Sequence, residues 1–133
     1  MRAIRFRGKD ENGKWVYGFL SMENMMLQIQ GSNIYRDGDD SFQKRFVDPE
    51  TVGQYIGQLD IIGNEIYEGD IIVYAYRSLF TNAIVADTLK VVVKYCSQNA
   101  GFVGNNGFSE SSLPIMGRTK ILGNIHDNKE LLK

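Results

Sequence analysis

The sequence predicts a mainly β protein with little helix, and three observations support that prediction. Short apolar-rich runs alternate with polar residues, turns containing glycine separate these runs, and almost no stretch repeats its apolar residues with the helical period. Many short strands joined in this way are typical of β-barrels and β-sandwiches. A chain of 133 residues is also long enough to bury a core without a metal or a disulfide. We expect an N-terminal β-hairpin region over residues 1–46 and a small β-barrel over residues 47–133, as two parts or as one compact unit.

The first predicted element is a hairpin. Residues 2–7 and 14–20 alternate between apolar and polar, and Asn12-Gly13 lies in the segment that joins them. Glycine supplies the positive φ that a hairpin turn requires. The period of two then predicts a core face made of Ile4, Phe6, Val16 and Leu20. It predicts an outward face made of Arg5, Arg7, Trp15 and Tyr17.

The next segment, residues 22–29, fits either a turn of helix or a third strand. Leu27 and Ile29 alternate with glutamines, which favours the strand. Residues 31–40 are expected to form a polar turn region, and residues 42–47 lead into the most informative part of the chain.

Residues 47–72 contain three turn signals. Asp48-Pro49 is typical of the start of a turn, Gly63-Asn64 has the pattern of a two-residue hairpin loop, and Gly69-Asp70 precedes a β-rich run that can enter a buried sheet. Between the first two signals, residues 51–55 predict a short strand. A strand that follows a Gly-Asp turn is common in SH3-like barrels, so by analogy we expect such a barrel from Val47 onward.

The rest of the chain predicts further strands. Residues 89–95 form one, Phe102-Val103 begins another, residues 105–107 form a turn and residues 120–125 form the last strand. Residues 74–89 are an unusually apolar stretch.

Three segments resemble the YopX family of phage and prophage proteins. The first covers residues 1–20. The second, residues 47–72, carries DPETVGQY and EIYEGDI, and in the third GNI precedes a short ELL tail within residues 121–132. Residues 74–89 depart from the family pattern and look like an insertion. The resemblance implies a phage or integrated prophage in a bacterial host and a protein that acts in the host cytoplasm. It supplies no active-site residues.

The charge is nearly balanced but unevenly distributed. The net charge is −1, yet residues 1–18 hold five basic residues and residues 37–70 hold nine acidic ones. Either these opposite charges lie close together in the fold, or they form two patches for a partner. The single cysteine, Cys96, has no second thiol for a disulfide and no nearby histidine for a zinc site, which favours a reducing compartment. No apolar run approaches the ~20 residues of a membrane helix.

Motifs for catalysis and metal binding are weak. The only histidine, His126, stands beside Asp127 without a nucleophile motif, and the acidic run at residues 37–40 lacks the spacing of a calcium loop. The glycines of residues 101–107 are not followed by the lysine of a phosphate-binding loop. Glu65, Glu68 and Asp70 cluster in the sequence, and Glu68 and Asp70 are interpreted as turn carboxylates that cap nearby backbone amides. We therefore expect no enzymatic activity, no metal and no cofactor.

Three function hypotheses follow. The first is a non-catalytic interaction module that binds a protein partner or assembles with itself as a homo-oligomer. Its expected interface is the apolar stretch, unless that stretch is core, with the residues Tyr74, Tyr76, Leu79, Phe80 and Ile84. The second is nucleic-acid binding through Arg5, Arg7, Trp15 and Tyr17. The sequence pI of about 5.8 argues against this second hypothesis. The third, an enzyme, has only scattered carboxylates in its favour, and its test is a pocket lined by Asp60, Glu65, Glu68 or His126.

Overall fold

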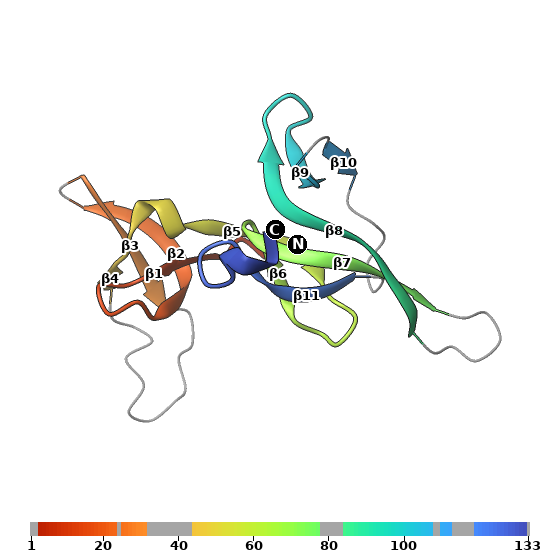
Figure 1. Ribbon diagram of the computed structural model, residues 1–133. Coiled ribbons are helices and arrows are strands. Elements are labelled where there is room, and N and C mark those ends of the chain that lie inside the picture. Colours follow the sequence, from red (N-terminus) through yellow and green to blue (C-terminus); the bar gives the residue numbers. More distant parts are fainter. Residues whose placement is uncertain are drawn as a thin grey trace. The chain divides into compact units, whose positions relative to one another are not determined.

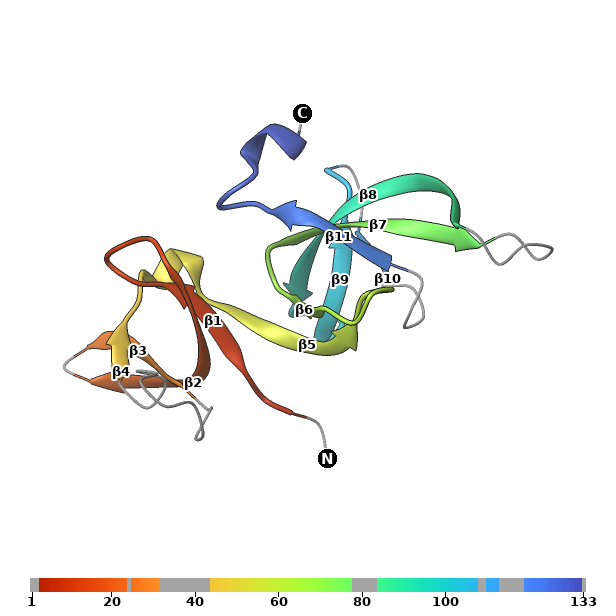
Figure 2. The same ribbon diagram turned by 90° about the horizontal axis from the view of Figure 1, so that it is seen from below.

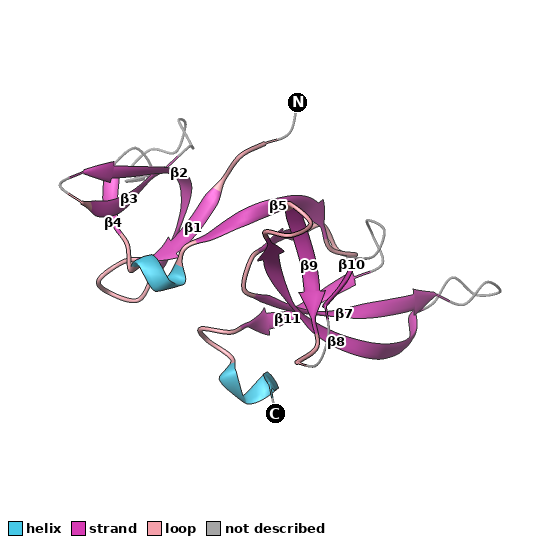
Figure 3. Cartoon of the chain, turned by 90° about the horizontal axis from the view of Figure 1, so that it is seen from above, coloured by secondary structure: helices cyan, strands magenta, loops and turns pink. Residues whose placement is uncertain are grey.

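The computed structural model describes residues 3–23, 25–31, 44–77, 84–107, 110–112 and 119–132 (Figure 1). These residues form strands and two short 3-10 helices, so the mainly β prediction is confirmed (Figure 3). The chain divides into two compact units, Met1–Tyr55 and Ile56–Lys133. Their boundary lies within strand β5, Gly53–Leu59. The division into residues 1–46 and 47–133, as two parts or as one compact unit, stays a prediction.

The first unit is an antiparallel sheet. Its strands are β1 (Phe6–Lys9), β2 (Trp15–Glu23), β3 (Met26–Gly31), β4 (Lys44–Phe46) and the start of β5. Their order is β4-β3-β2-β1-β5, because each consecutive pair from β1 to β4 forms a hairpin-like ladder and β5 returns beside β1. The predicted first hairpin and the predicted third strand are therefore confirmed.

The core of the first unit is small. Ile29 and Val47 are buried, and Gly8 lies so close to them that an added Cβ would stand 3.0 Å from the Val47 Cβ. Phe6, Val16 and Leu20 are partly buried, in line with their predicted face. Ile4 is exposed, which corrects its predicted place in the core; it precedes the first residue of β1.

A 3-10 helix, η1 (Pro49–Thr51), closes one end of this sheet. The Asp48 carboxylate accepts a hydrogen bond from the Glu50 amide, and proline begins the helix, as the predicted Asp-Pro turn requires. The Thr51 hydroxyl oxygen then accepts from the Lys9 amide at 2.8 Å. Because Thr51 belongs to this helix, the strand predicted at residues 51–55 begins only at Gly53.

One turn design occurs in both units. Asp10 and Asp60 each precede a glycine with positive φ by three residues, namely Gly13 and Gly63. In each turn one carboxylate oxygen accepts two backbone amide hydrogen bonds, and the aspartate amide donates across the turn to the residue four positions later. The loop between β5 and β6 (Glu65–Tyr67) is therefore longer than the predicted two-residue loop at Gly63-Asn64, because the Asp60 side chain organises all the residues up to Asn64.

The second unit contains a five-stranded antiparallel sheet in the order β10-β9-β8-β7-β11 (Figure 2). Its strands are β7 (Asp70–Arg77), β8 (Ile84–Cys96), β9 (Gly101–Asn105), β10 (Glu110–Ser112) and β11 (Thr119–Asn124). The end of β5 pairs with β6 beside it. A second 3-10 helix, η2 (Lys129–Leu132), follows β11.

The core of the second unit joins the β5–β6 hairpin to this sheet. Its buried members are Ile56, Ile66, Ile72, Val91 and Val93, and Phe102 and Ile121 pack against them. Ile71 and Val73, on the other face of β7, are buried as well. The prediction that the run after Gly69-Asp70 enters a buried sheet is thus confirmed.

Two further predictions concern this unit. The SH3-like barrel is not confirmed, because neither sheet closes into a barrel over the described residues. The apolar stretch at residues 74–89 includes the end of β7 and the first part of β8, which pair through Ala75 with Asp87 and Tyr76 with Ala86. Over its described residues this stretch therefore extends two core strands.

Candidate binding surface

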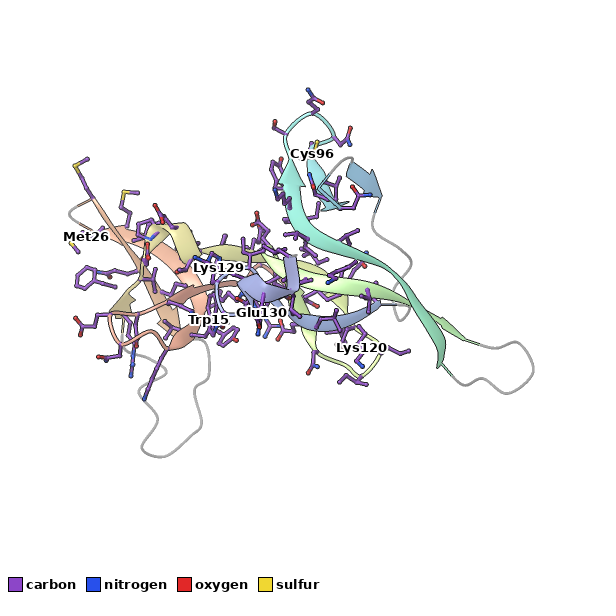
Figure 4. All side chains as sticks on the ribbon, viewed as in Figure 1. Trp15, Met26, Cys96, Lys120, Lys129 and Glu130 are labelled. Atoms are coloured by element: carbon purple, nitrogen blue, oxygen red, sulfur yellow. The ribbon has the colours of Figure 1, made fainter. Side chains whose placement is uncertain are left out.

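The outer face of the first sheet brings aromatic and cationic side chains together. The pairing of Arg7 with Tyr17 and of Lys9 with Trp15 places these residues on one face. The pairing of β2 with β3 and of β3 with β4 adds Phe19, Met26, Gln28 and Phe46, and that of β1 with β5 adds Tyr55. We call this set, together with Arg5, the outer face. Figure 4 shows Trp15 and Met26 on this sheet.

Cations lie over the aromatic rings at one end of this face. The Arg7 guanidinium carbon is 4.6 Å from the Trp15 ring centroid, and the Lys9 Nζ is 5.3 Å from the same ring. The Arg5 guanidinium carbon is 5.4 Å from the Tyr55 ring centroid. Such contacts stabilise a hairpin by about 0.5–1 kcal/mol each at exposed sites and more where water is excluded.

Of the four predicted nucleic-acid contacts, the structure places Arg7, Trp15 and Tyr17 side by side and Arg5 on Tyr55. Arg7, however, is only 6 % exposed, which corrects its predicted outward position. The Trp15 ring covers its guanidinium, so the arginine is part of the sheet's packing. Tyr17, at 47 % exposure, is the most open of the four.

Exposed apolar side chains occupy the other end of the outer face. Phe19, Met26 and Phe46 are each more than half exposed, and Gln28 is buried between the strands that carry them. Met25 adds an exposed apolar side chain at the end of the β2–β3 hairpin, whereas the exposed Met22 pairs with Leu27 on the opposite face. A patch of this kind on a small protein usually marks an interaction site.

Several members of the outer face were not predicted from the sequence. Tyr55 was missed because it joins the face only through the pairing of β5 with β1. Lys9 follows Arg5 and Arg7 with the same period of two, but the sequence interpretation placed it in the turn after the first strand. Phe19 was also missed, although it follows Trp15 and Tyr17 with the same period of two. That alternation is the sequence signal that could have identified it. Phe46 had no local signal, since its face depends on the pairing of β4 with β3.

The predicted partner interface is described only in part. Tyr74 and Tyr76 belong to β7 and Ile84 begins β8, whereas Leu79 and Phe80 lie outside the described residues. The acidic run at residues 37–40 also lies outside them. This interface therefore stays a prediction.

The candidate catalytic carboxylates act locally where their contacts are described. The Asp60 carboxylate accepts hydrogen bonds from the amides of Ile62 and Asn64 and from the Ile121 amide at 3.4 Å, so it holds a turn against β11. The Tyr67 hydroxyl donates to Glu65 at 3.5 Å. The His126 amide donates to the Asn124 side chain in the turn after β11.

The other turn aspartate, Asp10, has a perturbed acidity. The Lys14 amide that donates to its carboxylate lowers the pKa of Asp10 below its ordinary value of 3.8; burial opposes this shift, and Asn12 and Arg45 reinforce it. The Arg45 guanidinium lies 3.4 Å from the second carboxylate oxygen. This ion pair attaches the Asp10 turn to β4.

The described residues contain neither a cluster of metal-binding side chains nor a membrane-spanning helix. No group of three or more histidine, cysteine, aspartate or glutamate side chains among them could hold a metal ion. None of the helices in the described ranges has the length and apolar character needed to cross a bilayer.

Comparison with known proteins places the chain in a family. It resembles the crystal structure of protein EF1440 from Enterococcus faecalis with a TM-score of 0.53 and 20 % identity over 100 % of both chains, a likeness that concerns the fold. No curated protein matches the sequence. The YopX protein family matches residues 5–133, nearly the whole chain. The chain therefore belongs to the YopX protein family.

Proposed function

We propose that this chain is a non-catalytic binding module that recognises a protein partner through the outer face of its first sheet. The observation that carries the proposal is the exposure of Phe19, Met26 and Phe46 on one face. Aromatic residues, methionine and arginine are the side chains enriched in protein interfaces. The phage resemblance and the single cysteine support a place in the cytoplasm of a bacterial host.

The chemistry of the partner follows from charge. Arg5, Arg7 and Lys9 supply positive charge at one end of the outer face, and Glu23, which pairs with Met26, lies on the same face at its other end. A segment with aromatic or aliphatic side chains beside carboxylates would complement both ends.

Selection of peptides from a random library on the immobilised protein tests this proposal. We expect the enriched peptides to combine apolar residues with aspartate or glutamate and to bind with micromolar affinity. A Phe19→Ser, Phe46→Ser variant should bind them at least about tenfold more weakly, because it removes the exposed anchors. Ile62→Ser, which alters a still more exposed apolar side chain in the second unit, is the control. Peptides that bind the double variant and the wild type equally would refute the outer face as the site.

A second candidate function is binding of single-stranded nucleic acid. The cationic groups over Trp15 and Tyr55 favour it, since bases stack on aromatic rings while cations meet phosphates. The burial of Arg7 and the acidic pI weigh against it.

The fluorescence of Trp15, the only tryptophan in the chain, reports on this second candidate directly. Titration with single-stranded and double-stranded oligonucleotides, with labelled-strand anisotropy in parallel, should show saturable quenching that weakens with salt. An Arg5→Ala, Arg7→Ala variant should lose the signal, and its folding is checked by circular dichroism. No binding by the wild type at low salt would eliminate this candidate.

A further inference from the structure

The second unit carries a hollow of about 530 Å³ between β8, the end of β9 and the C-terminal segment. Its apolar lining includes Val92, Ile125, Leu131 and Leu132, and its charged lining is Lys90 and Lys94. Sites for small molecules usually measure about 300–1,000 Å³ and combine apolar walls with a few polar groups. The hollow has both properties.

The alternation of β8 creates one wall. Val91 and Val93 point into the core of the second unit, so Lys90, Val92 and Lys94 lie on the opposite side of the strand. The two lysines are exposed and the valine between them is partly buried. The strand therefore presents an apolar centre with a cation on each side.

The C-terminal segment forms the other wall, and described hydrogen bonds hold it in place. The Ile125 amide donates to the Gly69 carbonyl at 2.9 Å, and the Asn124 amide donates to the Asn128 side chain at 3.1 Å. The Lys90 Nζ then donates to the Leu131 carbonyl at 2.6 Å. Helix η2 is thus attached to β8 across the hollow. An ammonium has three donors, so two remain on Lys90 for a ligand.

The polar groups of the hollow are mainly donors. The Asn105 Oδ1 already accepts from the Gly107 amide at 2.8 Å, which leaves its amide nitrogen as a donor. The described residues that line the hollow include two lysines and no carboxylate. An apolar floor with cations at its rim complements an anion attached to an apolar body.

We propose that this hollow binds a small amphipathic carboxylate. Its apolar body would lie on Val92, Leu131 and Leu132, and its carboxylate would accept a hydrogen bond from Lys94, while the ammonium of Lys90 adds positive charge at the other end of the strand segment. This site lies in the second unit and does not depend on the outer face of the first, so the two proposals are tested separately.

Octanoate, used below the concentration at which it forms micelles, is a suitable probe. Two-dimensional amide NMR of the full chain should show saturable shifts at Lys90 to Lys94, at Asn105 to Gly107 and around Leu131. Acetate lacks the apolar body, octanol lacks the charge, and octylammonium reverses it; each should bind at least about threefold more weakly, because each loses one of the two complementary features.

Two lysine variants distinguish octanoate binding in the hollow from a general effect of surface charge. Lys94→Gln should weaken octanoate binding about three- to tenfold, because it removes one exposed charge-assisted contact. Lys120→Gln removes an exposed lysine from β11, outside the hollow, and should leave binding unchanged (Figure 4). The proposal would be overturned if octanol bound as tightly as octanoate, or if the amide shifts appeared only outside this region. It would also be overturned if the Lys94→Gln and Lys120→Gln variants lost the same amount of octanoate affinity.

Discussion

Asp10 and Asp60 hold equivalent positions in two turns of the same design, one in each unit. Each carboxylate accepts two amide hydrogen bonds within its own turn, from Asn12 and Lys14 in the first and from Ile62 and Asn64 in the second. The second oxygen of each then reaches another strand, through Arg45 on β4 or the Ile121 amide on β11. A single side chain therefore sets the loop and anchors it to the sheet in both units.

Removal of the Asp60 carboxylate should destabilise the protein. Asp60→Ala removes a buried carboxylate and leaves the Ile62, Asn64 and Ile121 amides without this acceptor, so we expect a loss of about 1–3 kcal/mol in the free energy of unfolding. Asp60→Asn keeps one acceptor oxygen and should cost less. Urea unfolding of both variants measures the difference, and equal stability of the alanine variant and the wild type would contradict this account.

The stabilisation from Asp10 should depend on pH. Because its pKa is lowered in the folded protein, its ionised form contributes stability that is fully present above the ordinary value of 3.8 and is lost as the pH falls through the lower folded value. The difference in unfolding free energy between the wild type and Asp10→Asn should thus be constant near neutral pH and shrink in acid. If this difference in unfolding free energy grew as the pH fell, the ionised Asp10 carboxylate would not be the stabilising form.

The contact of Gly8 with the first core predicts a strong effect from one methyl group. In Gly8→Ala the new Cβ would stand 3.0 Å from the Val47 Cβ and 3.3 Å from the Ile29 Cδ1, so the core must shift at a cost of about 1–3 kcal/mol. Gly101→Ala is the matched control, because its Cβ would meet only the Asn99 carbonyl oxygen, at 3.7 Å. Thermal unfolding should separate the two variants clearly.

The contact between Arg7 and Trp15 should stabilise the first sheet independently of any ligand. A double-mutant cycle with Arg7→Ala and Trp15→Ala should give a coupling free energy of about 0.5–2 kcal/mol, because the guanidinium is largely removed from water. Chemical unfolding without added ligand measures it. A coupling near zero would mean that the ring merely covers the arginine, and would return Arg7 to the group of candidate ligand contacts.

Local sequence signals were sufficient to predict the features that depend on neighbouring residues. Alternation and turn chemistry predicted the first hairpin, the strand at Leu27 and Ile29, the turn at Asp48-Pro49 and the buried strand after Gly69-Asp70. These signals are readable because a pleated strand alternates its faces and a turn needs particular φ values.

Which strands become neighbours depends on the folded chain as a whole. The return of β5 beside β1 brings Tyr55 to Arg5, and the pairing of β4 with β3 adds Phe46 to the outer face. The burial of Arg7 depends on the ring across the strand, and the hollow beside Lys90 requires the C-terminal segment to fold back on β8. These contacts join residues that are not neighbours in the chain. The pairing of strands depends on the total burial and on the register, and no local pattern in the sequence encodes either of them.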